Sequence, residues 1–290
     1  MFNVYPDGSV RDLQIVEELP TNAFGKYAIQ SIEKYKFHFE ENGKVVTPSE
    51  PYSITQRIDF KLKGQSQILT PRNKIKLEKI KTNAENGDVY AQYEYAAIQD
   101  RYFLEKEIDQ IKMNQWLFNA SQEGIADAQY RLGKNIYYGK DCKVEKQKGL
   151  DWVMQAAQIG NVYAQYMAYQ MLKNKLVVNQ SDVTPFYWLS QAAKNGLSIA
   201  QLNYAKEISY KLDPSENELK LAQEYIKNYA KETYKTVQWY QVSALIEHKL
   251  NNHKKAYSKI KSAFRLAKVY GWDLTELTDQ KKRIKEGKNS

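Results

Sequence analysis

The sequence predicts a mainly α-helical protein: an α-α superhelical repeat solenoid preceded by a small α+β region with the order strand, strand, helix, strand. Three observations lead to this prediction. A Gly-x-x-x-Ala-Gln pattern recurs along the middle of the chain at intervals of 36 or 37 residues. The N-terminal residues alternate between apolar and polar, as strands do, and the C-terminal residues return to the spacing of amphipathic helices. Repetition on this length scale is typical of stacked helix pairs.

Four glycines mark the repeat, and each is followed four residues later by Ala-Gln: Gly87, Gly124, Gly160 and Gly196. A tryptophan stands eight residues before each of the last three, at Trp116, Trp152 and Trp188. Glycine ends a helix by adopting the left-handed conformation, alanine lets two helices approach closely, and tryptophan fills the space between them. Each repeat is therefore predicted to be a helix pair that must stack on its neighbours to bury its apolar face.

This pattern resembles the Sel-one-like repeat, a relative of the tetratricopeptide repeat. The second repeat carries the resemblance most fully, through Leu132-Gly133, Tyr137, Gly139, Trp152, Ala156-Ala157 and Gly160. The other repeats depart from it where Gly133 stands, with Ala96, Tyr169 and Ala205. The resemblance covers about residues 72–212 and implies a scaffold that binds protein or peptide partners.

The N-terminal region is different in kind. Pro6-Asp7-Gly8-Ser9 lies between two alternating runs and predicts a hairpin. Apolar residues at helical spacing predict a helix over residues 22–37, Asn42-Gly43 predicts a turn, and alternation from Ser53 to Leu62 predicts a closing strand.

In order and residues, this region resembles the C-terminal domain of TonB-type energy transducers. The matching residues are Asp7-Gly8, Tyr35-Lys36-Phe37, Asn42-Gly43-Lys44-Val45-Val46 and Phe60-Lys61-Leu62. The chain begins inside the family's first strand, so we expect a domain truncated at its N-terminus. The resemblance implies a periplasmic or cell-envelope location and an edge strand that pairs with a peptide, such as one from an outer-membrane receptor. The candidate residues of that edge are Ser53, Ile54, Gln56, Ile58 and Phe60.

An alternative interpretation is a general repeat scaffold, cytoplasmic or not, whose N-terminal domain is purely structural. In both interpretations we expect three parts: residues 1–63 as the TonB-like domain, 64–212 as the repeat array, and 213–290 as two or three tetratricopeptide-like helices.

Tyrosine is abundant, at 23 of 290 residues, and gathers in the first helix of each repeat. Large, rigid tyrosine side chains are favoured in binding surfaces. We expect Tyr130 and Tyr166 to pack between helices. The candidates for an open groove on the concave face are Tyr90, Lys134, Tyr163, Gln170 and Lys206.

The net charge of +9 is concentrated at the C-terminus, because residues 231–290 contain 14 Lys and Arg against 6 Asp and Glu. A binder of nucleic acid or anionic surfaces is therefore a further alternative, although no nucleic-acid motif favours it. No apolar run approaches the ~20 residues that span a bilayer. No catalytic motif is present, and one Cys with three His does not suggest a metal site. We therefore expect a protein that is not an enzyme and binds neither metal nor cofactor.

Overall fold

The computed structural model describes residues 2–13, 25–41, 44–49, 51–54, 71–102, 109–140, 142–174, 176–178 and 183–287. The chain forms two compact units. We call residues 61–195 the repeat unit, and residues 1–60 together with 196–290 the terminal unit. The expected division into three parts stays a prediction. In the structure, residues from the first and third of those parts belong to the same unit.

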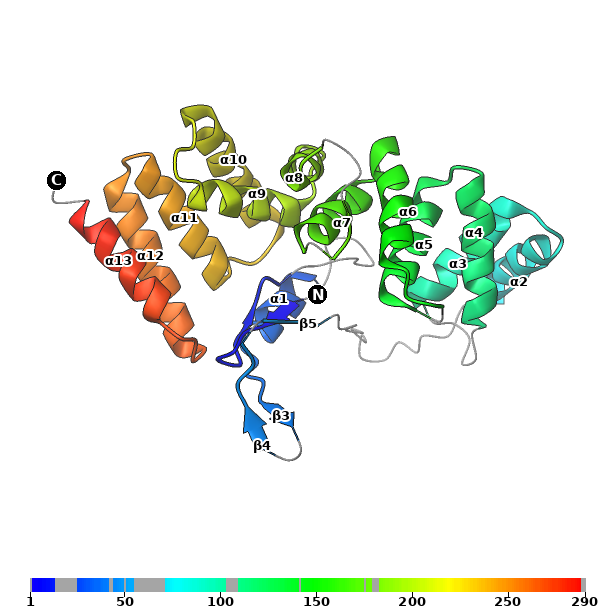
Figure 1. Ribbon diagram of the computed structural model, residues 1–290, viewed down its shortest axis with the longest axis horizontal. Coiled ribbons are helices and arrows are strands. Elements are labelled where there is room, and N and C mark those ends of the chain that lie inside the picture. The colour runs from blue at the N-terminus through cyan, green and yellow to red at the C-terminus, as the bar shows by residue number, and fades with distance from the viewer. Residues whose placement is uncertain are drawn as a thin grey trace. The chain divides into compact units, whose positions relative to one another are not determined.

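The repeat unit consists of successive helices that pack against their neighbours in the chain, as the periodicity predicts (Figure 1). They are α2 (Pro71–Glu85), α3 (Val89–Tyr102), α4 (Gln110–Gln122), α5 (Ala126–Tyr138), α6 (Lys146–Ile159), α7 (Val162–Lys173) and α8 (Pro185–Lys194). The helix-pair prediction for this part of the chain is confirmed.

A recurring contact joins one helix pair to the next. The repeat glycines have positive φ, for example 93° at Gly87 and 105° at Gly160, so each ends its helix in the left-handed conformation. The glutamine five residues after each glycine then reaches back to the helix that has just ended. Its amide nitrogen donates to the carbonyl oxygen eight residues earlier, in the pairs Gln92–Ala84 (3.1 Å), Gln129–Ser121 (3.1 Å) and Gln165–Ala157 (3.2 Å). We call this contact the glutamine joint.

The glutamine joint has a clear physical function. The last carbonyls of a helix have no partner within the helix, and a buried polar group without a partner destabilises the fold. All three glutamines are buried. The same carbonyls also accept the backbone N–H of the repeat glycine, so each glutamine is a second donor to its carbonyl and ties the following helix to that helix end.

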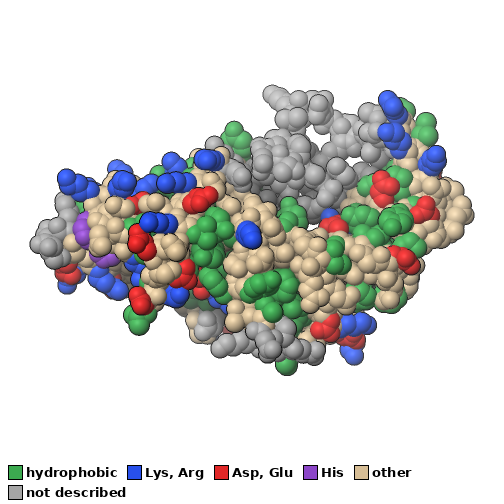
Figure 2. All heavy atoms as spheres, turned by 90° about the horizontal axis from the view of Figure 1, so that it is seen from above, with side chains coloured by type: hydrophobic (Ala, Val, Ile, Leu, Met, Phe, Trp, Pro, Cys, Tyr) green, Lys and Arg blue, Asp and Glu red, His purple; other side chains and the backbone are tan. Residues whose placement is uncertain are grey.

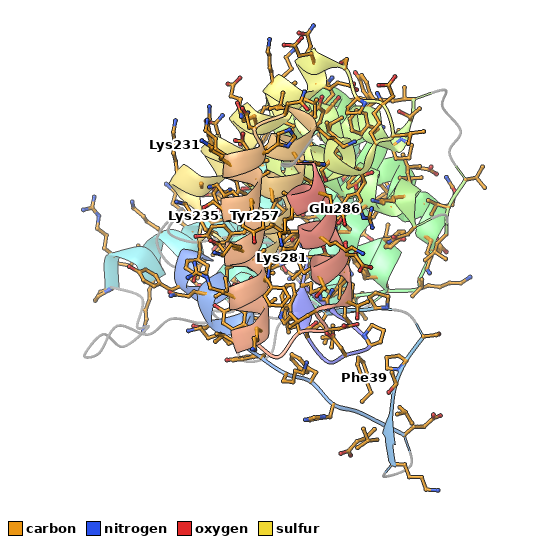
Figure 3. The ribbon with its side chains drawn as sticks, turned by 90° about the vertical axis from the view of Figure 1, so that its left-hand side faces the viewer. Phe39, Lys231, Lys235, Tyr257, Lys281 and Glu286 are labelled. Carbon is orange, nitrogen blue, oxygen red and sulfur yellow. The ribbon has the colours of Figure 1, made fainter. Side chains whose placement is uncertain are left out.

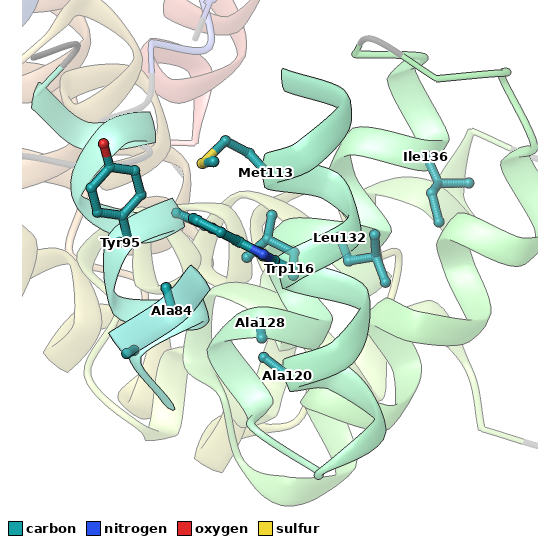
Figure 4. Packing of buried hydrophobic residues seen from close by; sticks show 11 residues of the cluster. Ala84, Tyr95, Met113, Trp116, Ala120, Ala128, Leu132 and Ile136 are labelled. Atoms are coloured by element: carbon teal, nitrogen blue, oxygen red, sulfur yellow. The ribbon is translucent and has the colours of Figure 1, made fainter. Parts of the chain in front are cut away.

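Aromatic side chains fill the space between the helices of a pair, as the tryptophan spacing predicts. Trp116 is buried and meets the ring of Tyr95 edge-on, with centroids 5.6 Å apart. Figure 4 shows this pair beside Met113, with Ala120 and Ala128 facing each other where two helices come close. Trp188 is likewise buried, whereas Trp152 is partly exposed.

Two glycines allow α5 and α6 to touch through their backbones. A Cβ atom at Gly133 would lie 2.7 Å from the carbonyl oxygen of Gly149, and a Cβ at Gly149 would lie 2.8 Å from that of Gly133. Both distances are too short for any side chain. The close approach of the α5 and α6 backbones therefore requires glycine at both positions, and this explains the glycine of the Leu132-Gly133 pair.

The N-terminal strands of the terminal unit form an antiparallel sheet in the order β2-β1-β5. It contains β1 (Phe2–Val4), β2 (Val10–Arg11) and β5 (Tyr52–Ile54). The predicted hairpin is confirmed, with Val4 opposite Val10. A second hairpin that was not predicted, β3 (Phe39–Glu41) with β4 (Lys44–Val46), projects away from this sheet (Figure 1).

The helix of this region, α1 (Gly25–Ile32), ends earlier than the predicted Phe37. Residues 35–37 instead pair with the first turn of the chain. The backbone N–H of Phe37 donates to the carbonyl of Gly8 at 2.9 Å, and its ring lies 5.8 Å from that of Phe2. Contacts with the β1–β2 hairpin thus outweigh the helical periodicity here. The predicted turn at Asn42-Gly43 and the strand beyond Ile54 lie outside the described residues.

Five helices complete the terminal unit: α9 (Ser198–Tyr210), α10 (Glu216–Glu232), α11 (Val237–Lys249), α12 (His253–Val269) and α13 (Thr275–Glu286). The prediction of two or three helices after residue 213 was wrong, since the described residues 213–287 form four. Ser215 opens α10 with a full capping box. Asn251 and Gly271 adopt positive φ and separate α11 from α12 and α12 from α13.

The N-terminal residues pack against these C-terminal helices. Tyr234, between α10 and α11, contacts the apolar cluster that contains Phe2, Val4 and Val10. The carboxylate of Asp12 accepts hydrogen bonds from Lys206 on α9 at 2.8 Å and from Gln238 on α11 at 2.9 Å. Burial raises the pKa of Asp12, but Lys206, with the hydrogen bonds from Tyr5 and Asn3, outweighs it and holds the pKa below its ordinary value.

The carboxylates of Asp7 and Glu33 also bond the N-terminal region to the C-terminal helices. The backbone N–H of Asp273 donates to Asp7 at 2.7 Å. Burial raises the pKa of Asp7, but this N–H and the bonds from Ser9 outweigh it and lower the pKa to about 2. The backbone N–H of Val237 donates to Glu33 at 2.7 Å, where burial prevails and raises the pKa of Glu33 to about 7. The N-terminal region is thus held to the C-terminal helices by polar bonds that range from exposed, at Asp7, to buried, at Glu33.

No helix in the described part of the chain has both the length and the apolar character needed to cross a membrane.

The raised pKa of Glu33 makes the stability of the terminal unit depend on pH. Because the folded state binds this proton more tightly than the unfolded state, the stabilisation is present below about pH 4.5 and is lost as pH rises through about 7. We expect the free energy of unfolding to fall, relative to Glu33→Gln, by up to about 3 kcal/mol over this range. Urea unfolding of both proteins from about pH 5 to about pH 8 measures it. Parallel pH profiles would contradict the assignment.

Candidate functional site

The first helices of the repeats, α3, α5 and α7, carry a row of tyrosines that we take as the candidate binding surface. Tyr90 and Tyr163 stand at equivalent positions, three residues after a repeat glycine, and are 71% and 40% exposed. Tyr163 stacks on Tyr130 of the preceding repeat, with ring centroids 6.2 Å apart. The Lys134 ammonium lies 5.6 Å from the centre of the Tyr130 ring. Together with Gln170, which lies further along α7, these residues make up what we call the tyrosine face.

A charged network fixes the helices beneath this face. The guanidinium of Arg131, on α5, donates to Asp127 at 2.7 Å and to Asp100 of α3 at 2.8 Å. Asp127 also accepts from the hydroxyl of Tyr93 at 2.8 Å, and Asp100 from Lys140 at 2.6 Å. The Arg131 side chain is only 5% exposed. Because paired buried charges hold a fixed geometry, the first two repeats present their tyrosines from a rigid base.

The local electrostatics favour the ionised form of the central carboxylate. Burial raises the pKa of Asp100, but Lys134, Lys140 and Arg131 outweigh it, so the pKa lies below its ordinary value. Lys134 is therefore close to a carboxylate as well as to the Tyr130 ring. Its ammonium is held over the tyrosine face, where it adds positive charge to an aromatic surface.

Helix α7 also carries two buried tyrosines. Tyr166 and Tyr169 are buried, with ring centroids 5.9 Å apart. Lys173 donates to the Tyr169 hydroxyl at 3.0 Å. The prediction that Tyr130 and Tyr166 pack between helices is confirmed, because both are buried. Gln170 is half-buried beside them.

The remaining candidates lie in the terminal unit. Lys206 is half-exposed, and its ammonium is bonded to Asp12, so a partner there would compete with the chain's own carboxylate. Ser53 and Ile54 lie on β5, which is an outer strand of the three-stranded sheet and faces Asn3 and Phe2 of β1. Ile54 packs against the N-terminal apolar cluster. Gln56, Ile58 and Phe60 lie outside the described residues.

Sequence reasoning did not identify the Asp100–Arg131–Asp127 network. Part of the signal was available, since Asp127 and Arg131 are four residues apart on one helix, the spacing of an ion pair. The link from Arg131 to Asp100 joins different repeats and had no such signal. Asp127 also occupies the position that tyrosine holds in the first and third repeats.

Among the residues that the structure describes, no group of three or more His, Cys, Asp or Glu side chains is arranged to hold a metal ion. The charges of the Asp100–Arg131–Asp127 network bond to one another and to the hydroxyl of Tyr93. The tyrosine face offers flat aromatic area, a hydrogen-bonding amide and a cation.

No protein-family model matches the sequence, and no curated protein matches it. Solved structures do match. A Sel1 repeat protein from Oxalobacter formigenes has a TM-score of 0.51 at 21% identity, over 64% of this chain and 54% of that one. The protein c5321, a protective antigen of uropathogenic Escherichia coli with an SLR fold, has a TM-score of 0.54 at 19% identity, over 73% of this chain and 52% of that one.

This chain therefore spans about half the length of each of these two proteins. Their fold confirms the Sel-one-like part of the resemblance, and neither description mentions a TonB-type domain. At these identities the likeness concerns the fold alone: the chain is a helical repeat protein with the fold of Sel1 repeat proteins.

Proposed function

We propose that this protein is a non-catalytic scaffold that binds a protein or peptide partner through the tyrosine face. The observation that carries the proposal is the exposure of Tyr90 and Tyr163 at equivalent positions of the first and third repeats, of which the first is tied to the second by the Asp100–Arg131–Asp127 network. Tyrosine combines a large contact area with few rotatable bonds, so it loses little conformational entropy on binding. A rigid base reduces the cost of ordering the surface when the partner arrives.

The chemistry of the face indicates what it would recognise. Lys134 supplies a positive charge, the tyrosine rings supply flat apolar area, and Gln170 supplies an amide. An extended segment with apolar side chains and a nearby carboxylate is complementary to this set. Helical repeat scaffolds use such extended faces for binding, and this supports a protein partner over a small molecule.

We expect the double variant Tyr90→Ala, Tyr163→Ala to lose its partners, because exposed tyrosines at the centre of an interface each contribute about 1–2 kcal/mol or more. The matched control is Tyr187→Ala on α8, where the tyrosine is 44% exposed but lies on a second helix of a repeat. Proteins retained from the source cells' lysate by wild type, double variant and control are quantified by mass spectrometry.

The expected result is a set of proteins retained by wild type and Tyr187→Ala and reduced at least about tenfold with the double variant. Thermal unfolding establishes that all three proteins are folded. Equal retention by the double variant would contradict binding through the tyrosine face.

A second candidate function rests on the N-terminal region and its resemblance to TonB-type transducers. The position of β5 at the outside of its sheet supports strand addition, in which a partner peptide pairs with a free strand edge. This function would require an envelope location and a receptor peptide. The bonds of Asp7, Asp12 and Glu33 to the C-terminal helices support the alternative, a purely structural N-terminal region.

Fractionation of the source cells, read with an antibody against the repeat unit, distinguishes strand addition from a purely structural N-terminal region. Strand addition to an outer-membrane receptor predicts recovery in the periplasm or with the inner membrane. Recovery in the cytosol alone would exclude it and leave the tyrosine face as the binding surface.

A further inference from the structure

The C-terminal helices carry unpaired positive charge. Helix α12, residues 253–269, contains six Lys and Arg and no Asp or Glu. Figure 2 shows Lys and Arg side chains spread over this end of the terminal unit, with Asp and Glu side chains among them. Within the described residues, neither Arg265 nor Lys235, just before α11, has a carboxylate partner. These cations therefore have no partner within the described chain to neutralise them.

Both cations line a cavity of about 510 Å³ between the end of α10, the start of α11 and α12. Its walls also include Tyr234, Tyr240, Leu266 and Val269. Val269 is largely exposed at its rim. Figure 3 shows Lys231 and Lys235 at the edge of α12 opposite α13. A cavity of this volume accommodates one or two side chains of a partner, and its walls combine apolar and cationic groups.

Crowding of like charges makes an added anion favourable here. The ammonium groups of Lys235 and Lys259 both lie over the Trp239 ring, 5.3 Å and 4.2 Å from its centre. Burial lowers the pKa of Lys259, and Lys235 lowers it further. Glu247 acts in the opposite direction, but its carboxylate already accepts from Gln223 and Asn252. A carboxylate from outside would relieve this repulsion.

We propose that this cavity is a second binding site, which takes an acidic peptide segment whose carboxylates pair with Lys235 and Arg265 while an apolar side chain enters between Tyr240 and Leu266. The site lies in the terminal unit and does not depend on the tyrosine face.

Two observations favour a peptide over a nucleic acid. Trp239 is buried and lies beneath Lys235 and Lys259, and Lys259 also lies 5.8 Å from the centre of the Tyr240 ring. The Trp239 ring is therefore occupied by two ammonium groups, whereas single-stranded nucleic acid is bound by stacking its bases on free rings. The walls of the cavity are also part apolar, through Tyr234, Tyr240, Leu266 and Val269, and these side chains suit an apolar side chain better than a phosphate backbone.

Fluorescence anisotropy with a labelled short peptide, a single leucine flanked by glutamates, tests the proposal on the full chain. The comparison probes are the same peptide with serine for leucine, a polyuridine RNA of similar length, and phosphatidylserine vesicles. The test variant is Lys235→Glu, Arg265→Glu. The matched control is Lys254→Glu, Lys255→Glu, which changes the net charge equally on exposed residues at the other end of α12.

We expect the leucine peptide to bind at least about fivefold more tightly than the serine peptide. We also expect the Lys235/Arg265 pair to weaken its binding by about tenfold or more, and the Lys254/Lys255 pair by less than about threefold. If the reversed pair does not fold, Lys235→Gln, Arg265→Gln removes the charges without reversing them, and the same order of effects is expected.

Equal weakening by both pairs would overturn the proposal in favour of general charge attraction. Equal affinity for the leucine and serine peptides would overturn the insertion of a side chain. If the RNA or the vesicles bind more tightly than the leucine peptide, and the Lys235→Glu, Arg265→Glu variant loses this binding, the site would be reassigned to those ligands.

Discussion

The repeat unit depends on the glutamine joint, in which a glycine ends one helix and its backbone N–H and a glutamine side chain both donate to one carbonyl at that end. The bond recurs at Gln92, Gln129 and Gln165 with nearly the same length. Because it is buried and spans the turn between helices, it sets where the next helix begins. The positions of Tyr90, Tyr130 and Tyr163 follow from it, since each lies within one turn of a joint.

Most of the repeat unit is predictable from the sequence because its determinants are local and recur. The glycine stops, the buried alanines and Trp116 act within one helix pair, and repetition makes them visible. The motif also contains the joint glutamine, but only the structure shows which carbonyl it meets. The outward position of Tyr90 and Tyr163 and the inward position of Tyr130 and Tyr166 follow from helical spacing alone.

The terminal unit is less predictable because its determinants are distant in sequence. Asp12 and Lys206 are 194 residues apart, and Glu33 and the Val237 amide are 204 apart. Nothing near Asp12 indicates that its carboxylate is buried against α9 and α11. The early end of α1 has the same origin, since Phe37 bonds to the β1–β2 turn and leaves the helix. Lys206 was expected in an open groove, and it meets the chain's own Asp12.

The two units thus differ in how they present a surface. In the repeat unit, paired charges lie beneath exposed rings. In the terminal unit, the carboxylates of the N-terminal region accept bonds from α9, α11 and the segment before α13, while Lys235 and Arg265 beside the cavity have no carboxylate partner among the described residues. A scaffold with an aromatic face and a separate basic cavity has two chemically distinct surfaces for binding, one in each unit.

The most direct test of the glutamine joint is Gln165→Leu, read by amide hydrogen exchange. This change removes the bonds to the Ala157 carbonyl and to Asn195 while keeping an apolar side chain of similar size. We predict faster exchange at the end of α6 and through α7, with a loss of about 1–3 kcal/mol in local stability. Unchanged protection across these helices would show that the joint does not position them, and the account of the tyrosine face would be contradicted.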